Sequence, residues 1–188
     1  LGGKNSAIVC ADADMALAAE CVADGMCLTA GQRCNATSRV LVEKKIAGDF
    51  LERLLASVSR YCPDDVLEET TMLGPLISFG ARERYERLVY LDAGEWILPG
   101  GILEKNSCEQ HGYWVLPAIA VVSDSSEFDR SPLAMDETFA PILVVETFSN
   151  DDAVRTRHEA WNYGLTASIF TSDQERFQRL GAGLSVGN

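Results

Sequence analysis

The sequence predicts an α/β fold in which a mostly parallel sheet carries helices on both faces. Short apolar runs of strand length alternate with longer runs whose apolar residues recur at helical spacing. Strands that alternate with helices in this way form parallel sheets covered on both sides. The 188 residues contain no internal repeat, low-complexity tract or linker, so we expect one domain with a substantial core.

The first third of the chain is predicted to contain two strands, each followed by a helix. Ser6–Cys10 is apolar and forms the first strand. Asp12 is a suitable N-cap for the next helix, which Gly31 ends. Ser38–Val42 forms the second strand, and Pro63 closes the helix after it. That helix has apolar residues at Ile46, Phe50, Leu51, Leu54, Leu55 and Val58.

The middle third is predicted as one helix and two strands. A charged helix covers about Ala81–Asp92, and a short strand, Trp96–Leu98, precedes a glycine pair. Tyr113–Val122 is a long apolar strand interrupted by Pro117. Because proline cannot donate to a sheet ladder, this part is predicted at an edge or at a bend.

The last third begins with a polar loop, Asp124–Pro141, and then alternates again. We predict a strand at Ile142–Phe148, a helix from about Asp151, a strand at Thr166–Thr171, a helix from about Asp173 and a final strand at Leu184–Gly187. Ligands of open α/β sheets bind beyond the carboxyl ends of the strands. On that rule we expect the site in the long loops before Cys34 and before Ile142.

The composition excludes several classes of partner. Apolar residues make up 47% and charged residues 23%, which is typical of a soluble globular domain. The formal net charge of −12, with no basic cluster, argues against nucleic acid and against an anionic membrane surface. No apolar run approaches the roughly 18 residues that a membrane span requires.

Cysteine and histidine usage predicts neither a disulfide framework nor a metal site. The chain has six cysteines, none in a C-x-x-C pair, and two histidines. Reduced thiols in a cytoplasmic protein fit this pattern best. The cysteines are Cys10, Cys21, Cys27, Cys34, Cys62 and Cys108.

Cys34 is the best candidate nucleophile among these cysteines, although its chemistry alone leaves a buried small hydrophobe as the commoner alternative. Arg33 beside it would favour the thiolate. Gly31 permits a tight turn whose amides could face a developing oxyanion. The other five cysteines are predicted to be core residues or inert thiols.

Other motifs are weak when taken singly. The opening L-G-G-K-N lacks the spacing of a phosphate-binding loop, and D-E-T-F-A-P is most simply a solvated loop. His111 and His158 have no companion carboxylate nearby in the sequence, so both are predicted to be structural or exposed.

Several boxes lie in a fixed order along the chain: L-G-G-K at Leu1–Lys4, G-Q-R-C at Gly31–Cys34 followed by A-T-S-R, D-E-T-F-A-P at Asp136–Pro141, Y-G-L-T-A-S-I-F-T, and the final S-V-G-N. In order and spacing they resemble the catalytic region of the aldehyde dehydrogenase superfamily. The resemblance covers essentially all 188 residues and implies a Rossmann-like three-layer catalytic domain.

The resemblance implies a role for five residues and a dinucleotide cofactor, NAD or NADP. Cys34 would attack the aldehyde, and its backbone N–H would form part of the oxyanion hole. Glu137 would bind the ribose next to the nicotinamide, and Phe139 would pack beside the nicotinamide. Arg33 and Asn35 would line the pocket of a small-molecule aldehyde.

The resemblance also implies that residues 1–188 are the catalytic domain of a longer chain, without its N-terminal nucleotide-binding domain and its C-terminal oligomerisation strand. The general base of the family, a glutamate, would fall one position before Leu1. We therefore expect no dehydrogenase turnover from the isolated chain. The full-length enzyme would be a homo-oligomer, a dimer or a tetramer.

Two alternatives to hydrolytic aldehyde oxidation stay open at this point. Some relatives release the thioester to coenzyme A rather than to water, and a non-catalytic α/β domain could keep the same fold. An arginine before the cysteine occurs in relatives that act on semialdehydes, and in many that do not. Departures from the family pattern are Ala140, Glu159 and the atypical stretch R-T-R-H-E-A-W.

Overall fold

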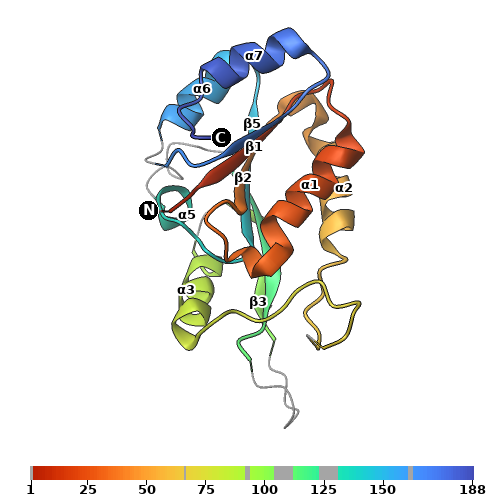
Figure 1. Ribbon diagram of the computed structural model, residues 1–188, viewed down its shortest axis with the longest axis vertical. Helices are drawn as coiled ribbons and strands as arrows, with labels where there is room; N and C mark the ends of the chain where they lie inside the picture. The colour runs from red at the N-terminus through yellow and green to blue at the C-terminus, as the bar shows by residue number, and fades with distance from the viewer. Residues whose placement is uncertain (1, 66, 92–93, 104–111, 123–130, 161–162) are drawn as a thin grey trace.

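A six-stranded sheet forms the centre of the computed structural model, which describes residues 2–65, 67–91, 94–103, 112–122, 131–160 and 163–188 (Figure 1). The strand order is β3-β4-β5-β2-β1-β6, and only the β3–β4 pair is antiparallel. The strands are β1 (Asn5–Val9), β2 (Thr37–Glu43), β3 (Glu95–Ile102), β4 (Val115–Val122), β5 (Ile142–Phe148) and β6 (Ala167–Phe170). The predicted α/β fold with a mostly parallel sheet is confirmed.

Helices cover both faces of this sheet, as Figure 1 shows. One face carries α1 (Met15–Cys27) and α2 (Ala47–Val58), and the other carries α6 (Asp151–Glu159) and α7 (Gln174–Ala182). The remaining elements are α3 (Phe79–Val89), α5 (Pro132–Met135) and two short 3₁₀ turns, η1 (Leu28–Gly31) and η2 (Lys44–Ile46). In the described residues, no helix combines the length and the apolar character that crossing a bilayer requires.

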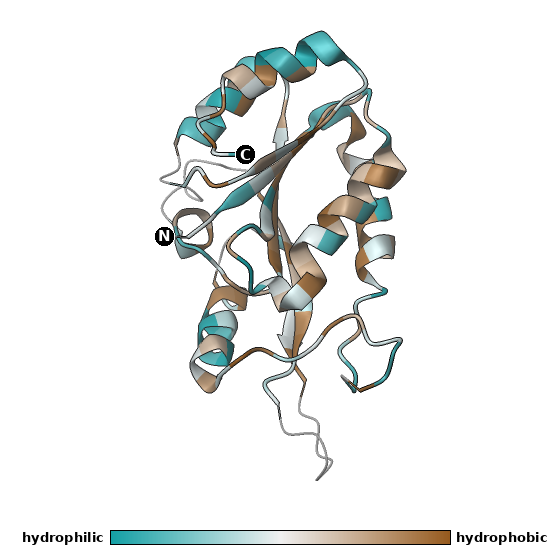
Figure 2. Ribbon diagram, viewed as in Figure 1, coloured by the Kyte–Doolittle hydropathy of each residue, from teal (hydrophilic) through white to brown (hydrophobic). Residues whose placement is uncertain are grey.

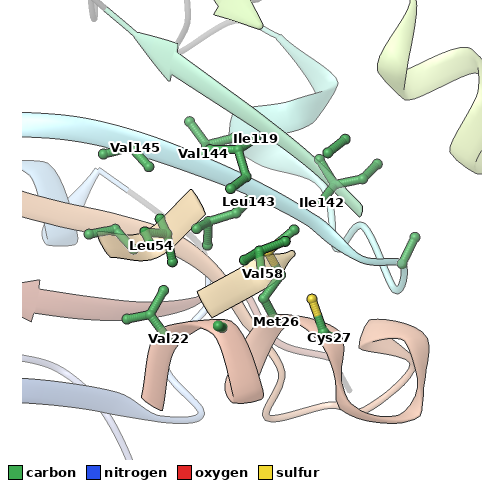
Figure 3. Close-up of a cluster of buried hydrophobic side chains, with 14 of the residues drawn as sticks. Val22, Met26, Cys27, Leu54, Val58, Ile119, Ile142, Leu143, Val144 and Val145 are labelled. Atoms are coloured by element: carbon green, nitrogen blue, oxygen red, sulfur yellow. The ribbon is translucent and has the colours of Figure 1, made fainter. Parts of the chain in front are cut away.

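Strand periodicity divides the core between these two faces. In β1, Ala7 and Val9 belong to the large cluster under α1 and α2, whereas Ile8 belongs to a smaller cluster under α6 and α7. Figure 2 shows the apolar residues concentrated on the strands and on the helix faces turned toward them. Figure 3 shows side chains of α1 and α2, such as Val22 and Leu54, directed at those of β4 and β5.

The first helix begins two residues later than the sequence predicted. Asp14, rather than Asp12, is the N-cap, and its carboxylate accepts from Leu17 N–H. Asp12 caps a different turn: its Oδ2 accepts from the backbone N–H groups of Ser172 and Asp173. The prediction was wrong because Asp12 accepts hydrogen bonds from a turn after β6, which is distant in the sequence but adjacent in the fold.

The part of the chain around Pro117 was predicted at an edge or at a bend, and the strand that contains it, β4, is not an edge strand as a whole. β4 lies between β3 and β5 in the sheet. Its pairing with β5 begins only at Ala118, whose N–H donates to Pro141 O. Pro117 therefore stands one residue before the stretch where β5 would need a donor, so the missing N–H costs no ladder bond on that side.

The final predicted strand is not a regular strand in the structure. Gly187 N–H and Asn188 N–H nevertheless donate to the carbonyls of Gly164 and Leu165, and Ala167 N–H donates to Asn188 O. The chain end therefore runs beside the segment that leads into β6, through a few backbone hydrogen bonds.

Candidate active site

Cys34 lies in the turn between η1 and β2, with its side chain exposed. Because β1, β2 and β5 are parallel, the segments that precede Asn5, Thr37 and Ile142 meet at one edge of the sheet, the amino edge. The expectation of a site beyond the carboxyl ends is therefore wrong, although the two loops named for it are the ones that converge.

The backbone before Cys34 adopts three consecutive left-handed conformations. Thr29, Ala30 and Gly31 have φ values of 58°, 52° and 66°. At Gly31 a Cβ atom would overlap the carbonyl of Ala140, so glycine is required by both conformation and space. The two non-glycine residues store about 1–2 kcal/mol each. Such a turn persists only where its surroundings hold it.

Gln32 holds this turn against a neighbouring loop. Its Oε1 accepts from Ile77 N–H at 2.9 Å, and its Nε2 donates to Thr29 O at 3.2 Å. Its own backbone N–H also donates to Thr29 O, at 3.0 Å. The shape of the turn thus depends on Gln32, a side chain within the G-Q-R-C motif.

Asn5 binds the turn of residues 29–36, called the nucleophile turn below because it carries the candidate nucleophile Cys34. Sequence analysis did not identify Asn5 as a site residue. Its Nδ2 donates to Cys34 O at 2.8 Å and to Ala36 O at 2.9 Å. Asn5 is buried at the first position of β1, before Ser6 and three apolar residues. A buried amide in such a strand is the one signal that could have pointed to it.

The Gly2–Gly3 segment brings Cys34 and Glu137 together. Gly3 N–H donates to Glu137 Oε1 at 2.8 Å, and a Cβ atom on Gly3 would overlap the carbonyl oxygen of Cys34. A Cβ atom on Gly2 would lie 2.8 Å from Glu137 Oε2. The two motifs that seemed weak singly, L-G-G-K and D-E-T-F-A-P, therefore pack together next to the backbone of Cys34.

Phe139, half-buried, lies two residues beyond Glu137 and has a positive φ of 48°. For a bulky residue this conformation is a genuine outlier. It lies next to Ala140, the residue whose carbonyl faces Gly31. The D-E-T-F-A-P box and the nucleophile turn thus both contain strained backbone where they touch, which is typical of functional sites.

Arg33 and Asn35 flank the thiol but face different surroundings. The Arg33 guanidinium donates to the carbonyls of Asp24 and Gly25, at 3.4 and 3.2 Å, near the carboxyl end of α1. A cation there complements the helix dipole, and it is a second donor to Asp24 O, which already accepts from Leu28 N–H. Asn35 is exposed beside Cys34.

The other described cysteines lack this setting. Burial raises the pKa of Cys10 to about 11 and that of Cys27 to about 12, so both remain thiols at neutral pH. Cys21 and Cys62 are exposed, Cys21 on α1 and Cys62 in the loop beyond α2. Cys108 and His111 lie outside the described residues.

A buried group of charges lies behind the site, on the α6 side of the sheet. Glu146 of β5 accepts from Arg39 Nε at 2.6 Å and from Arg157 Nε at 2.8 Å. His158 is buried, and burial lowers its pKa, which agrees with a structural role. The atypical R-T-R-H stretch thus packs α6 onto β5 through Arg157.

Lys4 belongs to the same buried region. Its Nζ is buried and makes no hydrogen bond within the described part of the chain. Burial, and next the charge of Arg39, lower the pKa of Lys4 to about 7, against the opposing effect of Asp136, Glu137 and Glu146. No group of three or more His, Cys, Asp or Glu residues among those described is placed to hold a metal ion.

Comparison with known proteins gives one consistent result. Residues 1–188 match the model of the aldehyde dehydrogenase family. Retinaldehyde dehydrogenase 3 of Mus musculus is 34% identical over 190 residues, which cover 100% of this chain and 35% of that protein. Betaine aldehyde dehydrogenase of Rhizobium etli is 34% identical over 192 residues, 100% of this chain and 38% of the relative.

Solved structures give the same picture. An NAD-dependent aldehyde dehydrogenase from Sinorhizobium meliloti superimposes with a TM-score of 0.90 at 29% identity, over 100% of this chain and 36% of that one. A betaine aldehyde dehydrogenase from Staphylococcus aureus, in complex with NAD+, superimposes with a TM-score of 0.88 at 29% identity, over 100% and 37%. The chain therefore spans little more than a third of the length of these relatives.

Proposed function

Because the chain belongs to the aldehyde dehydrogenase family, we propose that it forms the catalytic part of an NAD(P)-dependent enzyme that oxidises an aldehyde to a carboxylic acid. One observation carries the proposal. The Gly2–Gly3 segment lies against both the backbone carbonyl of Cys34, whose side chain is exposed, and Glu137, a carboxylate suited to a ribose. The same segment thereby positions both the proposed nucleophile and the proposed cofactor-binding residue.

The contacts of Glu137 support its proposed role in binding the nucleotide. Gly3 N–H occupies Oε1, and within the described residues Oε2 makes no hydrogen bond, so one oxygen can accept from a ribose hydroxyl. The glycines leave room that a Cβ atom would fill. Phe139 is the aromatic side chain next to it and would limit the movement of the nicotinamide ring. When bound, the nicotinamide accepts the hydride.

Cys34 performs the covalent chemistry in this proposal. Its thiolate attacks the carbonyl carbon, and the resulting oxyanion lies within reach of the Cys34 N–H. Loss of the hydride from the thiohemiacetal leaves a thioester on Cys34. Water attacks the thioester, the carbon–sulfur bond breaks, and the acid and the free thiol are released.

The two residues that flank Cys34 would border the substrate pocket, each in a different way. Asn35 offers an exposed amide beside Cys34, whereas the Arg33 guanidinium is bound to α1. We therefore place Arg33 at the pocket as the residue that fixes the turn. Its contacts give no reason to favour a substrate that carries a carboxylate.

Three further properties complete the proposal. NADP is an alternative to NAD, the full-length enzyme is a homo-oligomer, and it works in the cytoplasm, where exposed thiols such as Cys21 and Cys62 stay reduced. One similar plant enzyme, from Malus domestica, is described as peroxisomal, and that compartment would leave these thiols reduced too.

The test is turnover of the full-length enzyme with a panel of aldehydes, with NAD and with NADP, in the presence and absence of coenzyme A. We expect Cys34→Ala to reduce NADH production by at least about 10³-fold, whereas Cys21→Ala and Cys62→Ala change it little. Turnover that survives Cys34→Ala would reject the proposal. If turnover strictly required coenzyme A, then coenzyme A rather than water would be the acyl acceptor.

A further inference from the structure

We propose that Asn5 is a positioning residue for the nucleophile: its side-chain amide fixes the peptide plane after Cys34 and thereby the direction of the thiol. The inference rests on the proposed function, in which Cys34 attacks the substrate. Asn5 touches neither substrate nor cofactor in this account, and it acts through the backbone of the turn.

The hydrogen bonds that the described structure gives this amide all lie at the amino ends of the strands, where the candidate site lies. Nδ2 donates both of its protons, one to Cys34 O at 2.8 Å and one to Ala36 O at 2.9 Å. Oδ1 accepts from Thr166 N–H at 3.2 Å. Asn5 therefore joins three segments that are far apart in the sequence: β1, the nucleophile turn and the approach to β6.

The surroundings allow only one orientation of the amide. Two carbonyls lie on one side of it and an N–H lies on the other, so a flipped amide would place an oxygen against two oxygens. Asn5 is buried, and water cannot replace the lost donors readily. A side chain of the same shape that donates no proton would leave both Cys34 O and Ala36 O without this partner.

Each of the two peptide groups that flank Cys34 is fixed by a hydrogen bond, and Asn5 donates one of these two bonds. In the peptide before Cys34, the carbonyl of Arg33 accepts from Ala36 N–H at 3.1 Å. In the peptide after it, the Cys34 carbonyl accepts from Asn5. Fixing both planes fixes the Cα–Cβ direction of Cys34 and the N–H that would face the oxyanion.

The discriminating variant is Asn5→Asp in the full-length enzyme, because it keeps the shape and the acceptor but removes both donors. We expect kcat to fall about 10²-fold, the scale that a misplaced reacting group costs. The KM for NAD should stay within about threefold, because the Gly3–Glu137 contact is untouched. Hydrogen exchange should increase in a peptide that covers the nucleophile turn.

Asn150→Asp is the matched control, because the Asn150 side chain only accepts, from Ala153 N–H, and an aspartate does the same. It should leave kcat, KM and the turn's hydrogen exchange unchanged. If Asn5→Asp does not fold, Asn5→Ser decides, since one hydroxyl replaces one of two donors: a loss of about tenfold or more in kcat at constant KM is expected.

Two results would overturn the inference. The first is a kcat within twofold of the parent in either folded Asn5 variant. The second is a fall in kcat accompanied by an equal rise in KM and by faster exchange throughout the sheet, which indicates general destabilisation. Failure of the proposed function is distinguishable, because Cys34→Ala would then remain active while hydrogen exchange still reports on the Asn5 contacts.

Discussion

At the scale of single residues, the site depends on backbone geometry that few side chains tolerate. Gly3 approaches the Cys34 carbonyl, Gly31 approaches the Ala140 carbonyl, and Phe139 has a positive φ. Most of these constraints cannot be seen in a single sequence, because a glycine gives the same letter in a loose loop and in a contact that excludes Cβ. Cys34 itself gained its significance from the boxes around it rather than from its neighbours.

The strained turn gives a matched pair of predictions. Thr29→Asn should raise the free energy of unfolding by up to about 1 kcal/mol, because asparagine tolerates the left-handed region better than threonine. Gly31→Ala should lower it by about 2 kcal/mol or more, because the added Cβ overlaps Ala140 O. Urea denaturation measures both. Equal effects of the two changes would contradict the assigned geometry.

The buried lysine predicts a pH-dependent stability. The pKa of Lys4 is about 7 in the folded chain against 10.5 in the unfolded chain, so between these values the unfolded state binds the extra proton. The free energy of unfolding therefore rises with pH through this window, by up to about 1.4 kcal/mol per pH unit from this group. Below pH 7 the full penalty of burying the charge is present.

Lys4→Met removes this contribution and strands no hydrogen-bond partner in the described structure. The variant should be more stable than the parent at pH 6, and the difference should shrink as the pH rises from about 7 to 10. Chemical denaturation at intervals of one pH unit measures it. Stability curves that run parallel over that range would show that Lys4 does not titrate there.

At the scale of elements, β5 and α6 are joined by charges as well as by apolar contact. Glu146 lies between Arg39 of β2 and Arg157 of α6, and all three side chains are largely buried. Removing one member of a buried charge group leaves the others uncompensated. We therefore expect Glu146→Gln to lower the free energy of unfolding by about 3 kcal/mol or more.

An exposed ion pair supplies the control for that change. Asp152 and Arg155 are 3.0 Å apart, and both are mostly exposed. Asp152→Asn should therefore cost less than about 1 kcal/mol, since water and salt screen the pair. Thermal unfolding of both variants gives the comparison. A Glu146→Gln variant as stable as Asp152→Asn would mean that the buried group contributes little.

The order of elements could be predicted well from apolar periodicity, and their partners could not. Ile142–Phe148 was predicted with the bounds that β5 has, because its apolar run is bordered by a proline and by polar residues. Asp12 was assigned wrongly because the turn it caps belongs to a distant segment. For Pro117 the sequence did not show that β5 pairs with the same strand from Ala118 onward. The residues next to Asp12 and Pro117 in the sequence do not indicate which distant segments pack beside them.

At the scale of the whole molecule, the candidate site lies where the amino ends of the parallel strands β1, β2 and β5 come together. The segments before β1, β2 and β5 converge there, and they bring Asn5, Cys34 and Glu137 together from distant parts of the chain. The carboxyl edge is occupied by ion pairs of Arg176 with Glu43 and Asp151. The general rule for open sheets led us to expect the two loops that converge here, but it placed them at the carboxyl ends of the strands rather than at the amino ends.

In the proposed reaction, Cys34 carries the acyl group during turnover. The adduct can be located by mixing the full-length enzyme with an aldehyde and NAD, quenching with acid within one turnover, and analysing the peptides by mass spectrometry. We predict an acyl group on the peptide that contains Cys34, and none after Cys34→Ala. An acyl group on Cys21 or Cys62, or steady NADH formation with Cys34 unmodified throughout, would contradict it.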